Sequence, residues 1–325
     1  MRHDNYTLHG IPDQSTRNLL IAYRSLIALS SLIGDSLILI GSLRYNAIKL
    51  HKILTVFIRH LAVADLLYAV FTVLPGAVSL GADDWILGEI LCYLNYFIND
   101  YCGILACLLS AALTLCKLLI IIYPLRAIHF SSKAANLAAL CMWAYSAIFP
   151  VAAIAKEGGG VFFKYLIYNC DVSYTTWDHV EKSIEEIAAA LTVLVPTVVA
   201  VVSSIALIVQ AKRVANRLRG LQWQGVLTIV MIIAAHLLLS SPLIVFFIAS
   251  AFIPHSESNA NLCNLFRYSC FILQFSVVIN FYIYTLTLTS FREFLKSRIK
   301  KMTAPLRRYN AESKKEGTVR KMRGE

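Results

Sequence analysis

Long runs of apolar residues, separated by short polar segments, dominate this sequence. A helix needs about 20 residues to cross the roughly 30 Å hydrocarbon core of a bilayer. Seven runs reach that length, each bounded by polar or charged residues, and together they predict an all-α membrane protein built as a seven-helix bundle. The predicted spans are Ser25–Leu43, Ile53–Leu80, Ile90–Ile122, Ala134–Ala155, Ile187–Val209, Val226–Ile253 and Leu262–Thr289.

The composition supports a membrane protein. Of the 325 residues, 58% are hydrophobic and only 15% are charged, whereas soluble domains carry about 25% charged residues. A disordered chain needs low hydrophobicity. The net charge of +11 would suit nucleic-acid binding, but that function needs a soluble basic face. We therefore expect no nucleic-acid partner.

The charges are distributed unevenly between the two sides of the predicted bundle. With the N-terminus outside, 23 of the 30 Lys and Arg residues fall on the inner side, and 12 of the 19 acids fall on the outer side. Positive residues collect on the cytoplasmic side of membrane proteins, so this orientation is predicted. We expect a multi-pass protein of the plasma membrane. Asn5, in the sequon Asn5-Tyr6-Thr7, is then a candidate glycosylation site.

The cysteines are consistent with this orientation. Cys92 lies at the outer end of the third span, and Cys170 lies in the long loop between the fourth and fifth spans. Both face an oxidising compartment, where a disulfide is expected, and it would hold that loop over the mouth of the bundle. Cys263 and Cys270 are expected to be two unpaired small residues.

The segment after the last span alternates in character. Phe291, Phe294, Leu295 and Ile299 recur at helical spacing among Arg292, Lys296, Arg298 and Lys300. This pattern predicts a short amphipathic eighth helix over residues 291–301, lying on the anionic lipid of the inner leaflet. The alternative is a plain polar tail. A basic tail over residues 302–325 follows.

Several short motifs occur along the chain in a characteristic order and spacing. They are Leu61–Asp65, Trp85–Gly88 followed by Cys92, Tyr123–Arg126, Trp143, Pro196, Pro242, and Asn280–Tyr284 followed by Phe291. Over about Leu20–Lys296 the chain resembles the rhodopsin-like (class A) G-protein-coupled receptors. The resemblance implies an extracellular tail (residues 1–19), a receptor domain (20–290) and a heterotrimeric G protein as partner. An enzyme has no support, because no nucleophile triad, metal-ligand spacing or phosphate loop is present.

Several positions of the family's activation switch carry different residues here. Cys116, Lys117 and Leu118 replace the acid–arginine–tyrosine triad of the third helix. Lysine keeps the positive charge but lacks the planar fork of arginine, and Cys116 is no carboxylate, so the usual ionic lock cannot form in that way. Further replacements are Asp35 for asparagine, Ser204 for tyrosine, His236 for phenylalanine, Ser240 for the toggle tryptophan and Phe281 for proline.

Two function classes stay open. In the first, an extracellular ligand shifts the bundle and opens an inner crevice for the G protein, with Lys117, Leu125 and Tyr284 among the switch and contact residues. In the second, the altered switch belongs to a binding protein of the same fold that couples atypically or not at all. A transporter is disfavoured by the odd number of spans and the lack of internal repeats.

Two intramembrane acids, Asp35 and Asp65, occupy positions that face each other in the family. Ionisable residues inside a membrane are functional-site candidates, and two close carboxyl groups should not both ionise. The pair is expected to share a proton or to bind sodium at Asp65, near Ser276 and Asn280. The alternative is a satisfied polar cluster without a regulatory role, and Ala106, in place of a hydroxyl, argues against sodium. A lone histidine on an apolar helix is more often a packing residue than a proton sensor, and we expect the same of His236.

The family binds ligands between helices three, five, six and seven, which implies a pocket near Asn99, Asp100, Gly103, Phe247, Cys270 and Gln274. Gln274 stands where a retinal pigment needs a lysine, so no retinal is expected. Asn99 replaces the aspartate of amine receptors, and Asp100 is rotated by about 100° from it. The acidic outer loops favour a cationic ligand. The β-prone segment Val161–Tyr168 suggests a hairpin lid, and a peptide is favoured.

Overall fold

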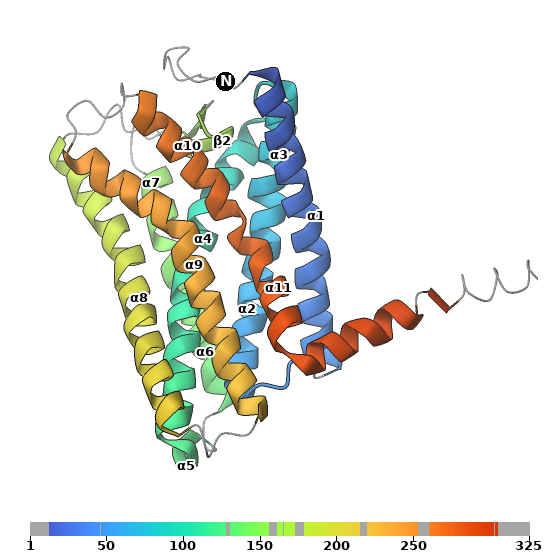
Figure 1. The fold of residues 1–325 in the computed structure, drawn as a ribbon. Helices are drawn as coiled ribbons and strands as arrows, with labels where there is room; N and C mark the ends of the chain where they lie inside the picture. The colour runs from blue at the N-terminus through green and yellow to red at the C-terminus, as the bar shows by residue number, and fades with distance from the viewer. Residues whose placement is uncertain are drawn as a thin grey trace, which may run out of the picture.

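A computed structural model describes residues 13–45, 47–127, 131–155, 161–164, 166–172, 179–214, 220–252, 260–301 and 303–304. It is a bundle of helices with a two-stranded hairpin at one end (Figure 1). Seven helical stretches of the described residues are long and apolar enough to span a membrane, which confirms the seven predicted spans. They are Gln14–Arg44, Lys52–Ala82, Glu89–Ile122, Ser132–Ala155, Leu191–Arg213, Trp223–Phe246 and Asn261–Thr287.

The spans are built from continuous and interrupted helices. Four are single helices: α1 (Gln14–Arg44), α4 (Glu89–Ile122), α8 (His179–Arg213) and α9 (Gly220–Phe252) form the first, third, fifth and sixth spans. Three spans are interrupted. The second consists of α2 (Lys52–Tyr68), the π-helical turn η1 (Ala69–Val73) and α3 (Leu74–Ala82). The fourth consists of α6 (Ser132–Ser146) and α7 (Ile148–Ala155), and the seventh of α10 (Ala260–Gln274) and α11 (Ser276–Thr287). A short helix, α5 (Pro124–Ala127), follows α4.

The first helix starts well before the predicted span. Asp13 caps it, because its side chain accepts hydrogen bonds from the backbone N–H groups of Ser15 and Thr16. Such a cap satisfies donors that have no partner within the helix. The helix therefore extends into the segment 1–19, which was expected to be a tail, and Asn5 lies outside the described residues.

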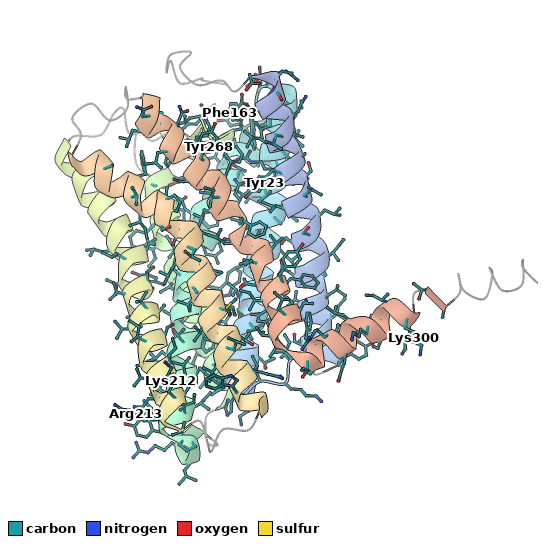
Figure 2. The ribbon with its side chains drawn as sticks, in the orientation of Figure 1. Tyr23, Phe163, Lys212, Arg213, Tyr268 and Lys300 are labelled. Carbon is teal, nitrogen blue, oxygen red and sulfur yellow. A yellow bond between two sulfur atoms is a disulfide. The ribbon has the colours of Figure 1, made fainter. Side chains whose placement is uncertain are left out.

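Strands β1 (Val161–Lys164) and β2 (Asn169–Val172) form an antiparallel hairpin, with Phe163 opposite Cys170. Phe163 and Tyr168 are fully buried, so the hairpin packs into the end of the bundle. We call this the hairpin end. The opposite end, where Lys212 and Arg213 of α8 lie, is the tail end (Figure 2).

The chain is helical again over residues 289–301, which leave the end of α11 at a steep angle to the bundle axis (Figure 1). Phe291 and Phe294 are buried, whereas Arg292, Lys296 and Lys300 are exposed. The predicted amphipathic eighth helix is therefore present. Its aromatic side packs on the bundle, and Arg298 lies 3.8 Å from the centre of the Tyr45 ring.

Packing between α1 and α11 compensates for one of the unusual residues. Gly34 of α1 faces Phe281, the residue that stands in the place of the family's proline. A Cβ atom at Gly34 would lie 2.7 Å from Cγ of Phe281, closer than any stable contact. The missing side chain at Gly34 thus makes room for the Phe281 ring.

We predict that Gly34→Ala lowers the thermal unfolding midpoint of the purified protein by several degrees, because overpacking costs about 1–3 kcal/mol. Gly81→Ala is the matched control, since nothing lies within 4 Å of a Cβ atom there. Alanine favours a helix over glycine, so the control should be neutral or stabilising. Equal midpoints for the two variants would contradict the packing argument.

Candidate functional site

A disulfide between Cys92 and Cys170 ties β2 to α4, as predicted. Cys263 and Cys270 are not joined to each other. Beside the disulfide, fully buried Asn95 bridges two elements: its Nδ2 donates to the carbonyl of Phe71 (2.9 Å), and its Oδ1 accepts from the backbone N–H of Cys170 (3.0 Å). The hairpin is therefore fixed to the bundle both covalently and by buried hydrogen bonds.

The side chain of Tyr168 also anchors the turn of the hairpin. Its hydroxyl donates to Oδ1 of Asp83 (3.0 Å), and Oδ2 of the same carboxylate forms an ion pair with Arg17 (2.8 Å). Burial, together with this hydrogen bond, raises the pKa of Tyr168 to about 12, so its phenol keeps the proton that it donates. Tyr168 itself has a left-handed backbone conformation, with φ of +49°.

Two arginines hold the same turn through its backbone. Arg24 of α1 is completely buried: its Nη1 donates to the carbonyl of Tyr168 (3.1 Å) and its Nη2 to that of Ile167 (2.7 Å). Arg267 of α10 is 5% exposed, and its Nε donates to the carbonyl of Leu166 (2.9 Å). Three consecutive carbonyls thus accept hydrogen bonds from two guanidinium groups, which we call the arginine clamp.

The clamp was not predicted from the sequence, in which Arg24 and Arg267 count only among the outer charges. The signal was present, since Arg24 follows the apolar run Leu19–Ala22 and precedes another apolar stretch. A charged residue inside an apolar helix is a functional-site candidate by default.

The predicted pocket residues fall into two groups. Asn99 and Asp100 lie together on α4: the amide of Asn99 donates to Oδ1 of Asp100 (3.0 Å) and accepts from the Tyr68 hydroxyl (3.3 Å). Gly103, one turn further on, is exposed and has nothing within 4 Å of an added Cβ atom. On α10, half-buried Cys270 and buried Gln274 form the second group. The side chain of Phe247 lies outside the described residues.

Gln274 is engaged by the arginine clamp. Its Oε1 accepts a hydrogen bond from Nε of Arg24 (3.1 Å). The position that would carry the retinal lysine in a pigment therefore holds an amide, and that amide helps to orient the guanidinium of Arg24 toward the hairpin turn.

The two intramembrane acids lie in one buried cluster. Oδ2 of Asp35 accepts from the Ser31 hydroxyl (2.6 Å), and Oδ2 of Asp65 accepts from Nδ2 of Asn280 (2.9 Å). Both carboxyl groups are buried, Asp35 being 0% and Asp65 5% exposed. Oδ1 of Asp35 and the hydroxyl of Tyr284 are buried without a hydrogen-bond partner among the described residues. Ser276 is half-buried at the first residue of α11.

At the tail end, Lys117 of α4 is buried, and a Cβ atom on Gly225 of α9 would lie 3.1 Å from its Nζ. Between described residues, the ion pairs are Arg17–Asp83 and Lys164–Asp171, so no described carboxylate pairs with Lys117. Cys116 and Leu118 beside it are half-buried, and Leu125 is 79% exposed.

Hydroxyl groups connect α9 to the seventh span and its extension. The hydroxyls of Thr228 and Thr287 lie 2.7 Å apart, and the Thr289 hydroxyl donates to Oε1 of Gln224 (3.3 Å). In contrast, Ser204 and Ser240 donate to carbonyls of their own helices. The tail end is therefore closed by neutral hydrogen bonds.

His236 of α9 contacts α4, with its Nε2 lying 3.5 Å from Sγ of Cys107. This contact suits the interpretation of His236 as a packing residue.

The comparisons with known proteins agree with this architecture. Residues 35–284 match the 7 transmembrane receptor (rhodopsin family) model, so the chain belongs to the rhodopsin family of seven-transmembrane receptors, which are not enzymes. The crystal structure of squid rhodopsin is similar, with 17% identity and a TM-score of 0.72 over 93% of this chain and 91% of that one. At this identity the likeness shows the fold alone. No curated protein matches the sequence.

We predict that Asn95→Ala lowers the free energy of unfolding by about 1–3 kcal/mol, because it removes the hydrogen-bond partner of the Phe71 carbonyl and of the buried Cys170 N–H. A thermal unfolding scan of the purified protein measures the change. Asn18→Ala on the exposed side of α1 is the control. An Asn95→Ala midpoint equal to that of the control would show that the bridge contributes nothing.

Proposed function

We propose that this protein is a plasma-membrane receptor with its N-terminus outside, and that it binds an extracellular ligand and signals through a heterotrimeric G protein. The hairpin end is then the ligand side and the tail end the G-protein side. The observation that carries the proposal is Lys117, which is buried against α9 and has no acidic partner among the described residues. A movement of α9 away from α4 would expose this cation without breaking an ion pair.

The closed bundle supports a two-state mechanism. The Thr228–Thr287 and Gln224–Thr289 contacts hold α9 beside the seventh span and its extension. Breaking both costs little, because neutral hydrogen bonds each contribute about 0.5–1.5 kcal/mol net. A ligand that prefers the open bundle by a few kcal/mol can therefore populate it.

A peptide is the ligand class that we favour, because the lid is a hairpin whose side chains are built into the mouth of the bundle. The exposed cations of residues 289–301, namely Arg292, Lys296 and Lys300, are placed to meet anionic inner-leaflet lipid. Asn5 is the proposed glycosylation site.

An atypically coupled or non-signalling receptor is the second candidate. Ser204 and Ser240, which replace switch residues of the family, bond only within their own helices among the described contacts, so the family's usual relay between helices is missing at these positions.

The experiment that tests signalling measures constitutive G-protein activation in cells, with surface expression confirmed. We predict that Lys117→Ala lowers activation about tenfold, the effect of some 1.4 kcal/mol, whereas Lys117→Arg retains it or raises it. Lys212→Ala is the control, since Lys212 is an exposed lysine at the same end. No response to any G protein in any variant would favour the second candidate.

We also propose that the Asp35–Asp65 cluster holds one compensating positive charge, as a proton or as a sodium ion. Buried carboxylates need such compensation, and the unpartnered Oδ1 of Asp35 offers a further ligand atom. Asp65, Asn280 and Ser276 would hold the ion with it. Sodium would supply the positive charge that otherwise arrives as a proton.

We predict that sodium raises the unfolding midpoint of the purified wild type relative to a bulky organic cation, more so at alkaline than at acidic pH, where protons compete for the carboxylates. Asp35→Asn should reduce this dependence, because only one acid remains. Glu293→Gln, at an exposed acid in residues 289–301, is the control. If neither sodium nor pH changes the wild type or Asp35→Asn, the cluster is a purely structural one.

A further inference from the structure

The two arginines of the clamp carry buried positive charge, and neither forms an ion pair with a carboxylate of the described residues. Arg24 is 0% exposed and Arg267 is 5% exposed. Among the described residues, they donate hydrogen bonds to the carbonyls of residues 166–168 and to the amide oxygen of Gln274. Two described acids at this end of the bundle have cations of their own, since Asp83 pairs with Arg17 (2.8 Å) and Asp171 pairs with Lys164 (2.7 Å).

Neutral acceptors satisfy the geometry of a guanidinium group but not its charge. Removing a cation from water costs several kcal/mol, which a neutral carbonyl only partly returns. A carboxylate would return more, because it forms charge-assisted and bidentate hydrogen bonds that are roughly twice as strong as neutral ones. Arg24 uses three of its five N–H donors in the described contacts. The turn is thus a weak occupant of a site that suits an anion.

The surroundings of Arg24 indicate which chemical group a bound anion would carry next to its charge. The Phe271 ring lies 4.5 Å from Cζ of Arg24, and Tyr23 donates to the carbonyl of Phe271 (2.8 Å). Figure 2 shows Tyr23 and Phe163 at this end of the bundle. The guanidinium is also confined by α3, because a Cβ atom at Gly76 would overlap its Nη1. The site is a cation beside aromatic rings, closed by the hairpin turn.

We propose that the arginine clamp is the recognition site for a ligand carboxylate that carries an aromatic or aliphatic neighbour group. The carboxylate binds Arg24 and Arg267 in place of the carbonyls of residues 166–168, and the hairpin turn is released. This inference rests on the proposed receptor function and deepens it, since the C-terminus of an apolar-ended peptide and a free aromatic acid share this chemistry.

The experiment uses the purified full-length protein and three probes at matched ionic strength. N-acetyl-phenylalanine represents a peptide C-terminus, 3-phenylpropionate represents a free acid, and N-acetyl-phenylalaninamide is the uncharged control. At about 10 mM the first probe should raise the unfolding midpoint by about 2–4 °C, and the amide should not. It should also increase hydrogen exchange in residues 166–172, because the turn loses its clamp.

The same shift of the unfolding midpoint with 3-phenylpropionate would assign the site to carboxylates in general. A shift with N-acetyl-phenylalanine alone would assign it to peptide C-termini. Arg24→Lys keeps the charge but loses the fork, and Arg267→Gln loses one cation. Both should reduce the shift at least fivefold, whereas Arg292→Gln, at an exposed arginine of residues 289–301, should not. If Arg24→Lys fails to fold, the comparison of the acids with the amide in wild type still decides.

Equal midpoints with acid and amide, or shifts that survive in both clamp variants, would overturn the proposal. The readout is binding alone, so its failure is distinct from a failure to activate G proteins. Carboxylate binding without G-protein activation would leave the site standing in a non-signalling receptor.

Discussion

The absence of water from the bilayer core is the constraint on which this structure depends. Every polar group inside the bundle must find its partner in the protein, because lipid offers none. The Asn95–Phe71, Asp65–Asn280 and Thr228–Thr287 contacts all meet this requirement between different helices. These contacts, rather than apolar packing alone, determine which helix faces which.

The few polar groups that meet the requirement incompletely are the ones with functional interest. Among the described residues, Arg24 has hydrogen-bond acceptors but no carboxylate partner. Lys117 has neither an acceptor nor a carboxylate partner among the same residues. Asp35 has one oxygen without a partner. Arg24 lies at the hairpin end, Lys117 at the tail end and Asp35 between the two ends. Each charge is therefore placed where a ligand, a G protein or an ion would complete it.

The replaced residues of the activation switch follow from local packing. Phe281 fits because Gly34 has no side chain. Lys117 fits because Gly225 leaves room for its Nζ, and its burial needs no acid at position 116. With neutral hydrogen bonds closing the tail end, the bundle needs no ionic lock to stay shut.

The sequence by itself determined the seven spans, the amphipathic segment after them and the Cys92–Cys170 bond. These features depend on local properties: the length of apolar runs, helical periodicity and the side of the membrane on which a cysteine lies. The early start of α1 at Gln14 was missed because a helix cap needs no apolar residues. Only the tertiary structure decided that Arg24 reaches the hairpin turn across more than 140 residues of sequence, and that Lys117 lies against Gly225. Such contacts depend on the rotation of each helix about its axis, which the packing of all the helices sets together.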